Sequence, residues 1–276
     1  ALLAGEPGVG KTRLLDAFLA EVADAGATVL RGVAFDGDGE PPYAPWSRAL
    51  GSHSLHLARP TGEASFELAE ERLRVGEVAF AAFAALSAER PVVVGLDDLH
   101  WAGADALWLF RHLARCMSHE PVLFVATCRN TPEDGRSTAE LIPLLRREAR
   151  VVEMTVCGLS LEATAAYLAQ LGTPPPTGLV RTLHVETNGN PLFLGEMFRH
   201  LVEERRLLSP TGSWQPELPG EGGKGIPGLS SGVERELHHA WEHTKEVFVV
   251  WKPRKAPSPF SFIQVRPCST RAEPRR

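Results

Sequence analysis

The stretch Gly5–Thr12, GEPGVGKT, constrains the fold of this chain more than any other part of it. It matches the pattern GxxxxGK[ST], in which glycines let the backbone wrap so closely that consecutive N–H groups point at phosphates. The pattern requires a buried strand before it and a helix after it, because the helix N-terminus adds its positive end to the site. The sequence predicts both, an apolar strand over 1–4 and an amphipathic helix over 11–26.

This loop predicts a nucleotide site that binds ATP or ADP with Mg²⁺. Lys11 would reach the β- and γ-phosphates, and the hydroxyl of Thr12 would ligate the metal ion. The residues predicted to bind the nucleotide here are Gly5, Glu6, Pro7, Gly8, Val9, Gly10, Lys11, Thr12 and Arg13.

The rest of the first 157 residues predicts an α/β fold of the P-loop NTPase class. Apolar runs rich in Val and Leu alternate with helix-period segments, which is typical of a parallel sheet covered by helices. Further strands are predicted over 27–35, 91–98, 121–130 and 150–156, and helices near 66–88, 104–117 and 138–148. The result is a five-stranded parallel sheet sandwiched by helices. The acidic, Gly/Pro-rich stretch 36–46 is predicted to be a loop.

The strand 91–98 ends in two carboxylates, Asp97 and Asp98. A P-loop needs a carboxylate for Mg²⁺ at the tip of the adjacent strand, so Asp97 is predicted to hold the metal ion through water. Asp98 would face the γ-phosphate and polarise an attacking water, or it would instead cap the helix that begins near 104. Gly95, inside the same strand, suggests that another backbone packs closely there.

The strand 121–130 ends with polar residues at the sheet edge where ligands of such folds bind. Thr127 or Arg129 could sense the γ-phosphate there, and the alternative for Arg129 is an exposed residue at the start of a loop. We therefore predict Asp98, Lys11 and Arg129 as the catalytic residues.

The pattern becomes wholly helical after the sheet. Helices are predicted over 158–172, near 178–187 and over 191–207, with Ser160 and Asn190 as N-caps. We therefore predict an ATPase core over 1–157, a helical lid over 158–208, a Gly/Pro-rich linker over 209–232, and a poorly ordered basic tail over 233–276.

Charge and cysteine usage narrow the function classes. The net charge of −5 gives no reason to expect binding to DNA or to a membrane surface, although residues 245–276 hold eight basic against two acidic residues. Four cysteines without a CxxC pair, together with no signal peptide, predict a reducing, cytoplasmic location.

Several motifs taken together resemble the ATPase module of the STAND branch of AAA-related P-loop proteins, as found in large LuxR-type transcription regulators and bacterial multidomain cyclases and kinases. The resemblance covers residues 1–207 and is carried by GEPGVGKTRLL, GDGEPPYAPW, DDLHWA, TCRN and TNGNPLFLGEM. It implies a switch that is closed with ADP, opens on exchange for ATP and is reset by hydrolysis. It also implies that Arg129 reads phosphate and that Pro191 lies by the adenine.

The chain departs from that family at both ends. The family has residues before the P-loop that cover the adenine, and a winged helix and sensor domains after the lid. Because the sequence after residue 232 does not resemble a winged helix, we expect a fragment with a non-native tail; a private extension is the alternative. The expected partners are ATP, the protein's own effector and sensor domains, and further copies of the chain in an ATP-dependent assembly.

The sequence therefore predicts a Mg-ATP-binding module that hydrolyses ATP slowly as a signalling switch. One alternative is a switch that exchanges ADP for ATP with negligible hydrolysis, because no arginine finger is identifiable in the sequence. The other is a small-molecule kinase, which the paired carboxylates and the position of the lid disfavour.

Overall fold

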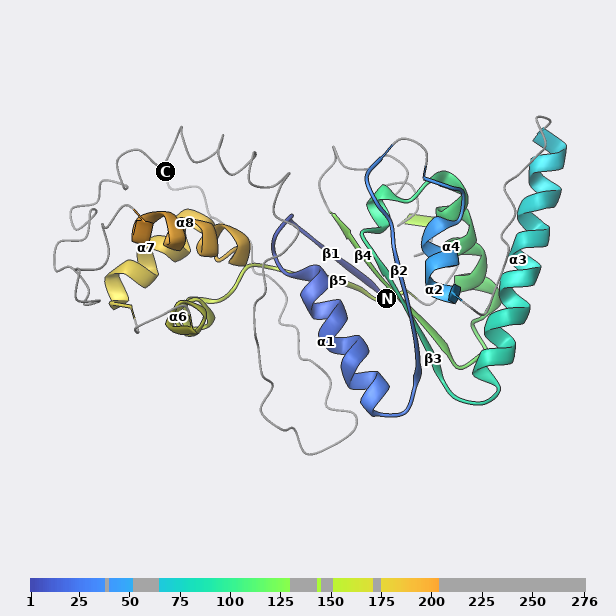
Figure 1. Cartoon of the computed structure of the whole chain (residues 1–276), viewed down its shortest axis with the longest axis horizontal. Coiled ribbons are helices and arrows are strands. Elements are labelled where there is room, and N and C mark those ends of the chain that lie inside the picture. The colour runs from blue at the N-terminus through green and yellow to red at the C-terminus, as the bar shows by residue number, and fades with distance from the viewer. Residues whose placement is uncertain (38–39, 52–64, 130–142, 145–150, 171–174, 204–276) are drawn as a thin grey trace. The chain divides into compact units, whose positions relative to one another are not determined.

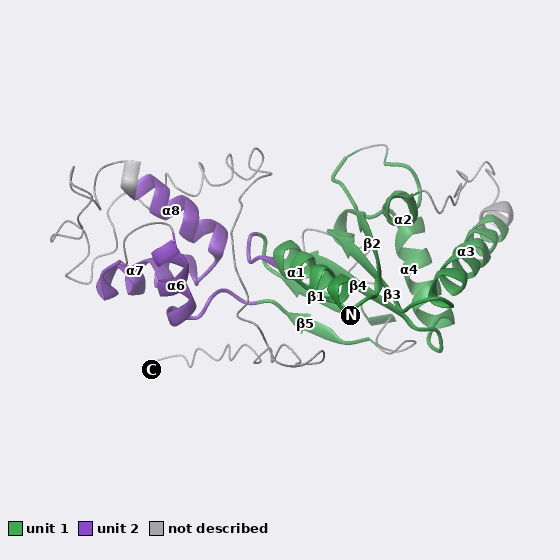
Figure 2. Cartoon of the chain, turned by 60° about the horizontal axis from the view of Figure 1, so that its bottom comes forward, with its two compact units in different colours: residues 1–7, 11–156, 262–276 green, residues 8–10, 157–261 purple. Residues whose placement is uncertain are grey.

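The computed structural model describes the chain outside residues 38–39, 52–64, 130–142, 145–150, 171–174 and 204–276. The described residues fall into two compact units (Figure 2). One contains residues 1–7 and the described part of 11–156, and the other contains residues 8–10 and the described residues between 157 and 203. The predicted linker and basic tail lie outside the described residues, as does almost all of the helix predicted near 138–148. No helix in the described part of the chain is long and apolar enough to cross a lipid bilayer.

Five parallel strands form one sheet in the first unit, in the order β2-β3-β4-β1-β5 (Figure 1). Their bounds are β1 Leu2–Gly5, β2 Thr28–Val33, β3 Val92–Asp97, β4 Val122–Arg129 and β5 Glu153–Thr155. The predicted α/β fold class, a five-stranded parallel sheet sandwiched by helices, is confirmed. The strand β1 lies inside the sheet, so the loop that follows Gly5 opens at its carboxyl edge.

Helices cover both faces of this sheet. On one face, α1 (Lys11–Asp24) packs with a small core that includes Leu3, Leu15 and Leu19. On the other, α2 (Ala44–Leu50), α3 (Ser65–Ser87) and α4 (Ala104–Cys116) close a larger core (Figure 1). Side chains of successive strand residues point to opposite faces, which is why Leu2 belongs to the larger core and Leu3 to the smaller.

Gly95 of β3 makes room for side chains, so the prediction that another backbone packs there was wrong. A Cβ at this position would lie 2.7 Å from Cδ1 of Leu19 and 3.3 Å from Cδ1 of Leu15. The missing side chain therefore lets α1 sit close against β3.

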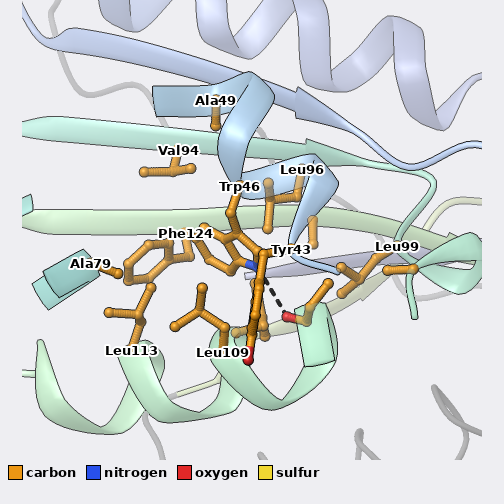
Figure 3. Packing of buried hydrophobic residues seen from close by; sticks show 14 of the residues in the cluster. Tyr43, Trp46, Ala49, Ala79, Val94, Leu96, Leu99, Leu109, Leu113 and Phe124 are labelled. Atoms are coloured by element: carbon orange, nitrogen blue, oxygen red, sulfur yellow. Dashed lines mark hydrogen bonds between the residues drawn. The ribbon is translucent and has the colours of Figure 1, made fainter. Parts of the chain in front are cut away.

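The predicted loop over 36–46 was wrong from residue 44 onward, because the short helix α2 begins there. Proline is tolerated in a first helical turn, and Pro45 occupies that turn. The physical reason for the helix is Trp46, whose side chain is fully buried and donates from Nε1 to the carbonyl oxygen of Ala106 at 2.9 Å. The centre of its ring lies 5.8 Å from that of the Phe124 ring (Figure 3). The centre of the Phe83 ring lies 6.1 Å away.

We expect Trp46→Ala to lower the free energy of unfolding of the full chain by about 3–5 kcal/mol, because it empties a large buried site in the core. Urea unfolding followed by circular dichroism measures the change. Trp46→Phe, which loses the Nε1 hydrogen bond but keeps an aromatic ring, should have a smaller effect. An unchanged unfolding midpoint for Trp46→Ala would contradict the central place of Trp46 in this core.

The second unit contains three helices around a core of their own. They are α6 (Leu161–Gln170), α7 (Thr177–Thr187) and α8 (Pro191–Glu203), and their shared core includes Leu168, Leu183 and Leu194. Two predicted N-caps are confirmed. Ser160 Oγ accepts from the backbone N–H of Ala163 at 3.1 Å, and Asn190 Oδ1 accepts from that of Leu192 at 3.1 Å.

Candidate active site

The loop between β1 and α1 has the backbone that its glycines predict. The strand ends at Gly5 and the helix begins at Lys11. Gly8 and Gly10 have φ of 75° and 101°, a left-handed region that side chains other than glycine rarely adopt. The first turn of α1 contributes backbone N–H groups that have no partner within the helix, and these are suited to an anion.

Lys11 lies folded back on the loop from which it projects. Its Nζ donates to the carbonyl oxygens of Gly5 at 3.0 Å and Glu6 at 2.8 Å, and the residue is 7% exposed. Burial lowers the pKa of Lys11; the neighbouring carboxylate of Asp98 opposes this shift, and the charge of Arg129 adds to it. The ammonium group is thus held in a partly desolvated position, where an anionic ligand would gain from it.

The carboxylate of Asp97, the last residue of β3, is the meeting point of three side chains. Its Oδ1 accepts from Thr12 Oγ1 at 3.1 Å and from Thr127 Oγ1 at 2.6 Å. Its Oδ2 accepts from Arg31 Nη2 at 3.2 Å. Asp97 is only 3% exposed, so these contacts fix its orientation.

Asp97 does not stand on the strand next to the P-loop strand, which corrects the expectation of an adjacent strand. In the sheet order, β4 lies between β3 and β1. Helix α1 contacts both β3 and β4. Its first turn therefore carries Thr12 to Asp97 across the intervening strand.

Arg31 is a part of the site that the sequence reasoning missed. It lies in β2, and its Nη2 joins Asp97 to Asp16 of α1, where the contact to Asp16 Oδ1 is 2.9 Å. The signal that could have found it was a charged residue within the otherwise apolar strand predicted over 27–35. Arg31 thus places a positive charge directly against the carboxylate of Asp97.

Asp98 leaves the strand in a left-handed conformation, with φ of 54° and ψ of 43°. Its side chain caps neither the short 3₁₀ helix η2 (Leu99–Trp101) nor α4, whose N-cap position is Gly103. The alternative prediction, that Asp98 caps the helix beginning near 104, is therefore wrong. Burial and the nearby Asp97 raise the pKa of Asp98, while Lys11, Arg129 and Arg31 partly offset the shift.

Arg129 ends β4 directly beside the P-loop strand, in register with Gly5. Its guanidinium carbon lies 5.1 Å from the centre of the Trp101 ring, within the range of a cation–π contact. Its positive charge contributes to lowering the pKa of Lys11 and opposes the upward shift in the pKa of Asp98. The register thus brings Arg129 to the same sheet edge as the other predicted catalytic residues.

Pro191, predicted to lie by the adenine, is the first residue of α8 in the second unit. Its role stays a prediction. The same holds for the nucleotide contacts predicted for Pro7, Val9 and Arg13.

The P-loop, the first turn of α1 and the two carboxylates at the end of β3 all belong to one recognised segment. Residues 1–125 match the family model described as the AAA ATPase domain. This segment of the chain is therefore similar to an AAA ATPase domain. The match bears out the predicted resemblance to an AAA-related P-loop ATPase module and indicates that the segment binds a nucleotide. Its place in the STAND branch stays a prediction. The matched residues include Lys11, Thr12, Asp97 and Asp98, whereas Thr127 and Arg129 follow the matched segment in sequence.

Several solved structures are similar to this chain at low sequence identity. Cdc6p from Pyrobaculum aerophilum is 17% identical over 74% of this chain and 55% of that one, with a TM-score of 0.48. The ORC1 protein of Aeropyrum pernix, solved in complex with DNA, is 18% identical over 75% and 55%, with a TM-score of 0.46. A STAND protein with a tetratricopeptide repeat sensor from Pyrococcus horikoshii is 17% identical over 70% and 26%, with a TM-score of 0.41.

The match thus spans 55% of the length of the first two of these proteins and 26% of the third. No curated protein matches the chain significantly.

Proposed function

We propose that this chain binds Mg-ATP through residues 5–13 and hydrolyses it slowly, as the switch module of a larger signalling or transcription-regulating protein. The observation that carries the proposal is the hydrogen bond of 3.1 Å between Thr12 Oγ1 and Asp97 Oδ1. It joins the hydroxyl at the end of a phosphate-binding loop to a buried carboxylate. We further propose residues 1–157 as the ATPase core and 158–208 as its lid.

The residues present fit a magnesium ion. Mg²⁺ prefers oxygen ligands and usually binds proteins through one or two carboxylates together with substrate phosphates and water. Thr12 and Asp97 offer a hydroxyl and a carboxylate in contact with each other, and the hydrogen bond from Arg31 helps to fix the orientation of that carboxylate. When bound, Mg²⁺ neutralises charge on the β- and γ-phosphates.

The protein's own contribution to hydrolysis is positioning and charge. Lys11 exchanges the carbonyl oxygens of Gly5 and Glu6 for phosphate oxygens, and the backbone N–H groups of the loop hold the remaining phosphate oxygens. The carboxylate of Asp98 accepts a hydrogen bond from a water and orients it toward the γ-phosphorus. The water oxygen bonds to the γ-phosphorus as the bond from this phosphorus to the β–γ bridging oxygen of ATP breaks. The products are ADP and inorganic phosphate, and the proton that the water loses passes to the phosphate or to solvent.

A single-turnover experiment tests this proposal. The full chain, in excess over γ-labelled Mg-ATP, should release phosphate faster than Lys11→Ala under the same conditions. Binding of ATP without phosphate release above that of Lys11→Ala would replace hydrolysis with the exchange switch. Transfer of the label to an added small molecule would instead indicate a kinase.

The switch role predicts different conformations with the two nucleotides. Limited proteolysis of the full chain should give different cleavage patterns with ADP and with a non-hydrolysable ATP analogue. Identical patterns at saturating concentrations of both would contradict a switch.

The raised pKa of Asp98 predicts how hydrolysis depends on pH. The ionised carboxylate accepts a stronger hydrogen bond from the water than the neutral acid does and polarises it more, so kcat/KM should fall as the pH drops through the pKa of Asp98. Burial and Asp97 raise that pKa, so the fall should begin above the usual range of aspartate, about 3.9. The pH profile of Asp98→Asn should lack this fall at low pH. Because ATP titrates equally in both experiments, the difference between the two profiles belongs to Asp98. The same fall at low pH in both proteins would assign it to the titration of ATP and contradict the role of Asp98.

A further inference from the structure

One hydroxyl group connects the two carboxylate residues at the end of β3. Thr127, in β4, is 0% exposed. Its Oγ1 donates to Asp97 Oδ1 at 2.6 Å and accepts from the backbone N–H of Asp98 at 2.8 Å. A hydroxyl has a single proton to donate, and the bond to Asp97 uses it. The proton of the Thr127 hydroxyl is therefore used within the protein, at the end of β3.

The residue that receives this support adopts an unusual backbone conformation. Asp98 has φ of 54°, which side chains with a Cβ adopt at a cost in free energy. The turn begins directly after β3, where the strand's hydrogen bonding ends. The bond from Asp98 N–H to Thr127 is thus a tertiary contact that holds the left-handed turn in place.

We infer that Thr127 is a positioning residue, which fixes the metal-side carboxylate of Asp97 and the water-side residue Asp98 relative to each other. The inference rests on the proposed function and deepens it. Thr127 acts only through its two neighbours: Asp97 Oδ1 stays turned toward Thr12, and the backbone of Asp98 stays turned so that its side chain leaves the strand. Loss of the hydroxyl should misplace the water-orienting group while the P-loop stays intact.

The matched pair Thr127→Val and Thr127→Ser tests this inference in the full chain. Valine keeps the shape and removes the hydroxyl, whereas serine keeps the hydroxyl and removes a methyl group. We expect Thr127→Val to lower kcat about 10- to 100-fold, because small misplacements of catalytic groups have effects of this size. The dissociation constant for ATP should change less than about 3-fold, since the phosphate-binding residues are untouched. Thr127→Ser should retain most of the wild-type kcat.

Two further measurements separate positioning from a merely structural role. Rates are expressed per ATP-binding site, so that a loss of folded protein does not count as a loss of turnover. Thr164→Val provides the control, because Thr164 is also 0% exposed and also uses its hydroxyl in a buried contact, to His184 at 3.0 Å. It should lower stability without changing kcat per site.

The double variant gives the sharpest outcome. If Thr127 acts through Asp98, then adding Thr127→Val to Asp98→Asn should lower kcat no further. Fully additive losses would overturn the inference, as would wild-type kcat per site in Thr127→Val. If Thr127→Val does not fold, Thr127→Cys, whose thiol is only a weak hydrogen-bond donor, carries the same test.

The outcome is distinguishable from failure of the proposed function. If the wild-type chain releases no phosphate above Lys11→Ala, the proposed hydrolysis fails, and the inference about turnover falls with it. If the wild type hydrolyses ATP and Thr127→Val matches it per site, only the positioning role is lost.

Discussion

Replacing Lys11 with alanine should weaken ATP binding by about 100-fold or more, the largest effect on affinity that we expect from any single change. Lys11 is the ammonium group that a phosphate would meet in the loop, and it is held there by only two carbonyl oxygens. Burial lowers the pKa of Lys11, which means that the protonated side chain is destabilised in the empty loop. A bound phosphate would stabilise this protonated form. That unfavourable position is what makes a phosphate a strongly favoured partner.

Isothermal titration calorimetry with Mg-ATP measures the loss. Lys11→Met, which keeps an unbranched apolar stem, should lose as much affinity as Lys11→Ala, because charge rather than packing is removed. Arg115→Ala is the matched control, since it removes one positive charge from an exposed position in the last turn of α4. Retention of wild-type affinity by both Lys11 variants would defeat the phosphate-loop assignment.

Replacing Asp98 with asparagine should abolish most turnover while leaving ATP bound. We expect kcat to fall by about 10²–10⁴-fold, the range for a positioned group that acts on the attacking water. The backbone should tolerate the change, because asparagine is among the residues that most readily adopt the left-handed conformation that Asp98 has here. The affinity for ATP should be equal or slightly higher, since a negative charge beside the phosphates is removed.

The measurement pairs single-turnover phosphate release with a binding titration on the same protein. Asp24→Asn, which makes the same chemical change at an exposed residue at the end of α1, should behave as the wild type. Unchanged turnover in Asp98→Asn would move the water-orienting role to another group. Loss of binding along with turnover would assign Asp98 to nucleotide binding.

Much of the fold could be read from the sequence because its signals are local. The apolar strands, the amphipathic helix after the P-loop and the caps at Ser160 and Asn190 depend on residues within a few positions of one another. The short helix α2 escaped this reasoning, because a Pro/Gly-rich composition predicts a loop. What makes it a helix is the burial of Trp46 between distant elements.

The sequence by itself determined the phosphate-binding loop, the five strands and the pair of carboxylates that closes β3. Only the tertiary structure decided that β4 lies between β3 and β1, that Arg31 and Thr127 hold Asp97, and that Asp98 turns left-handed without capping a helix. The reason is distance along the chain. The hydrogen bonds on Asp97 join residues 85, 66 and 30 positions apart. The local sequence pattern determines on which face of the sheet a side chain lies. Which distant side chain it contacts there depends on the order of the strands.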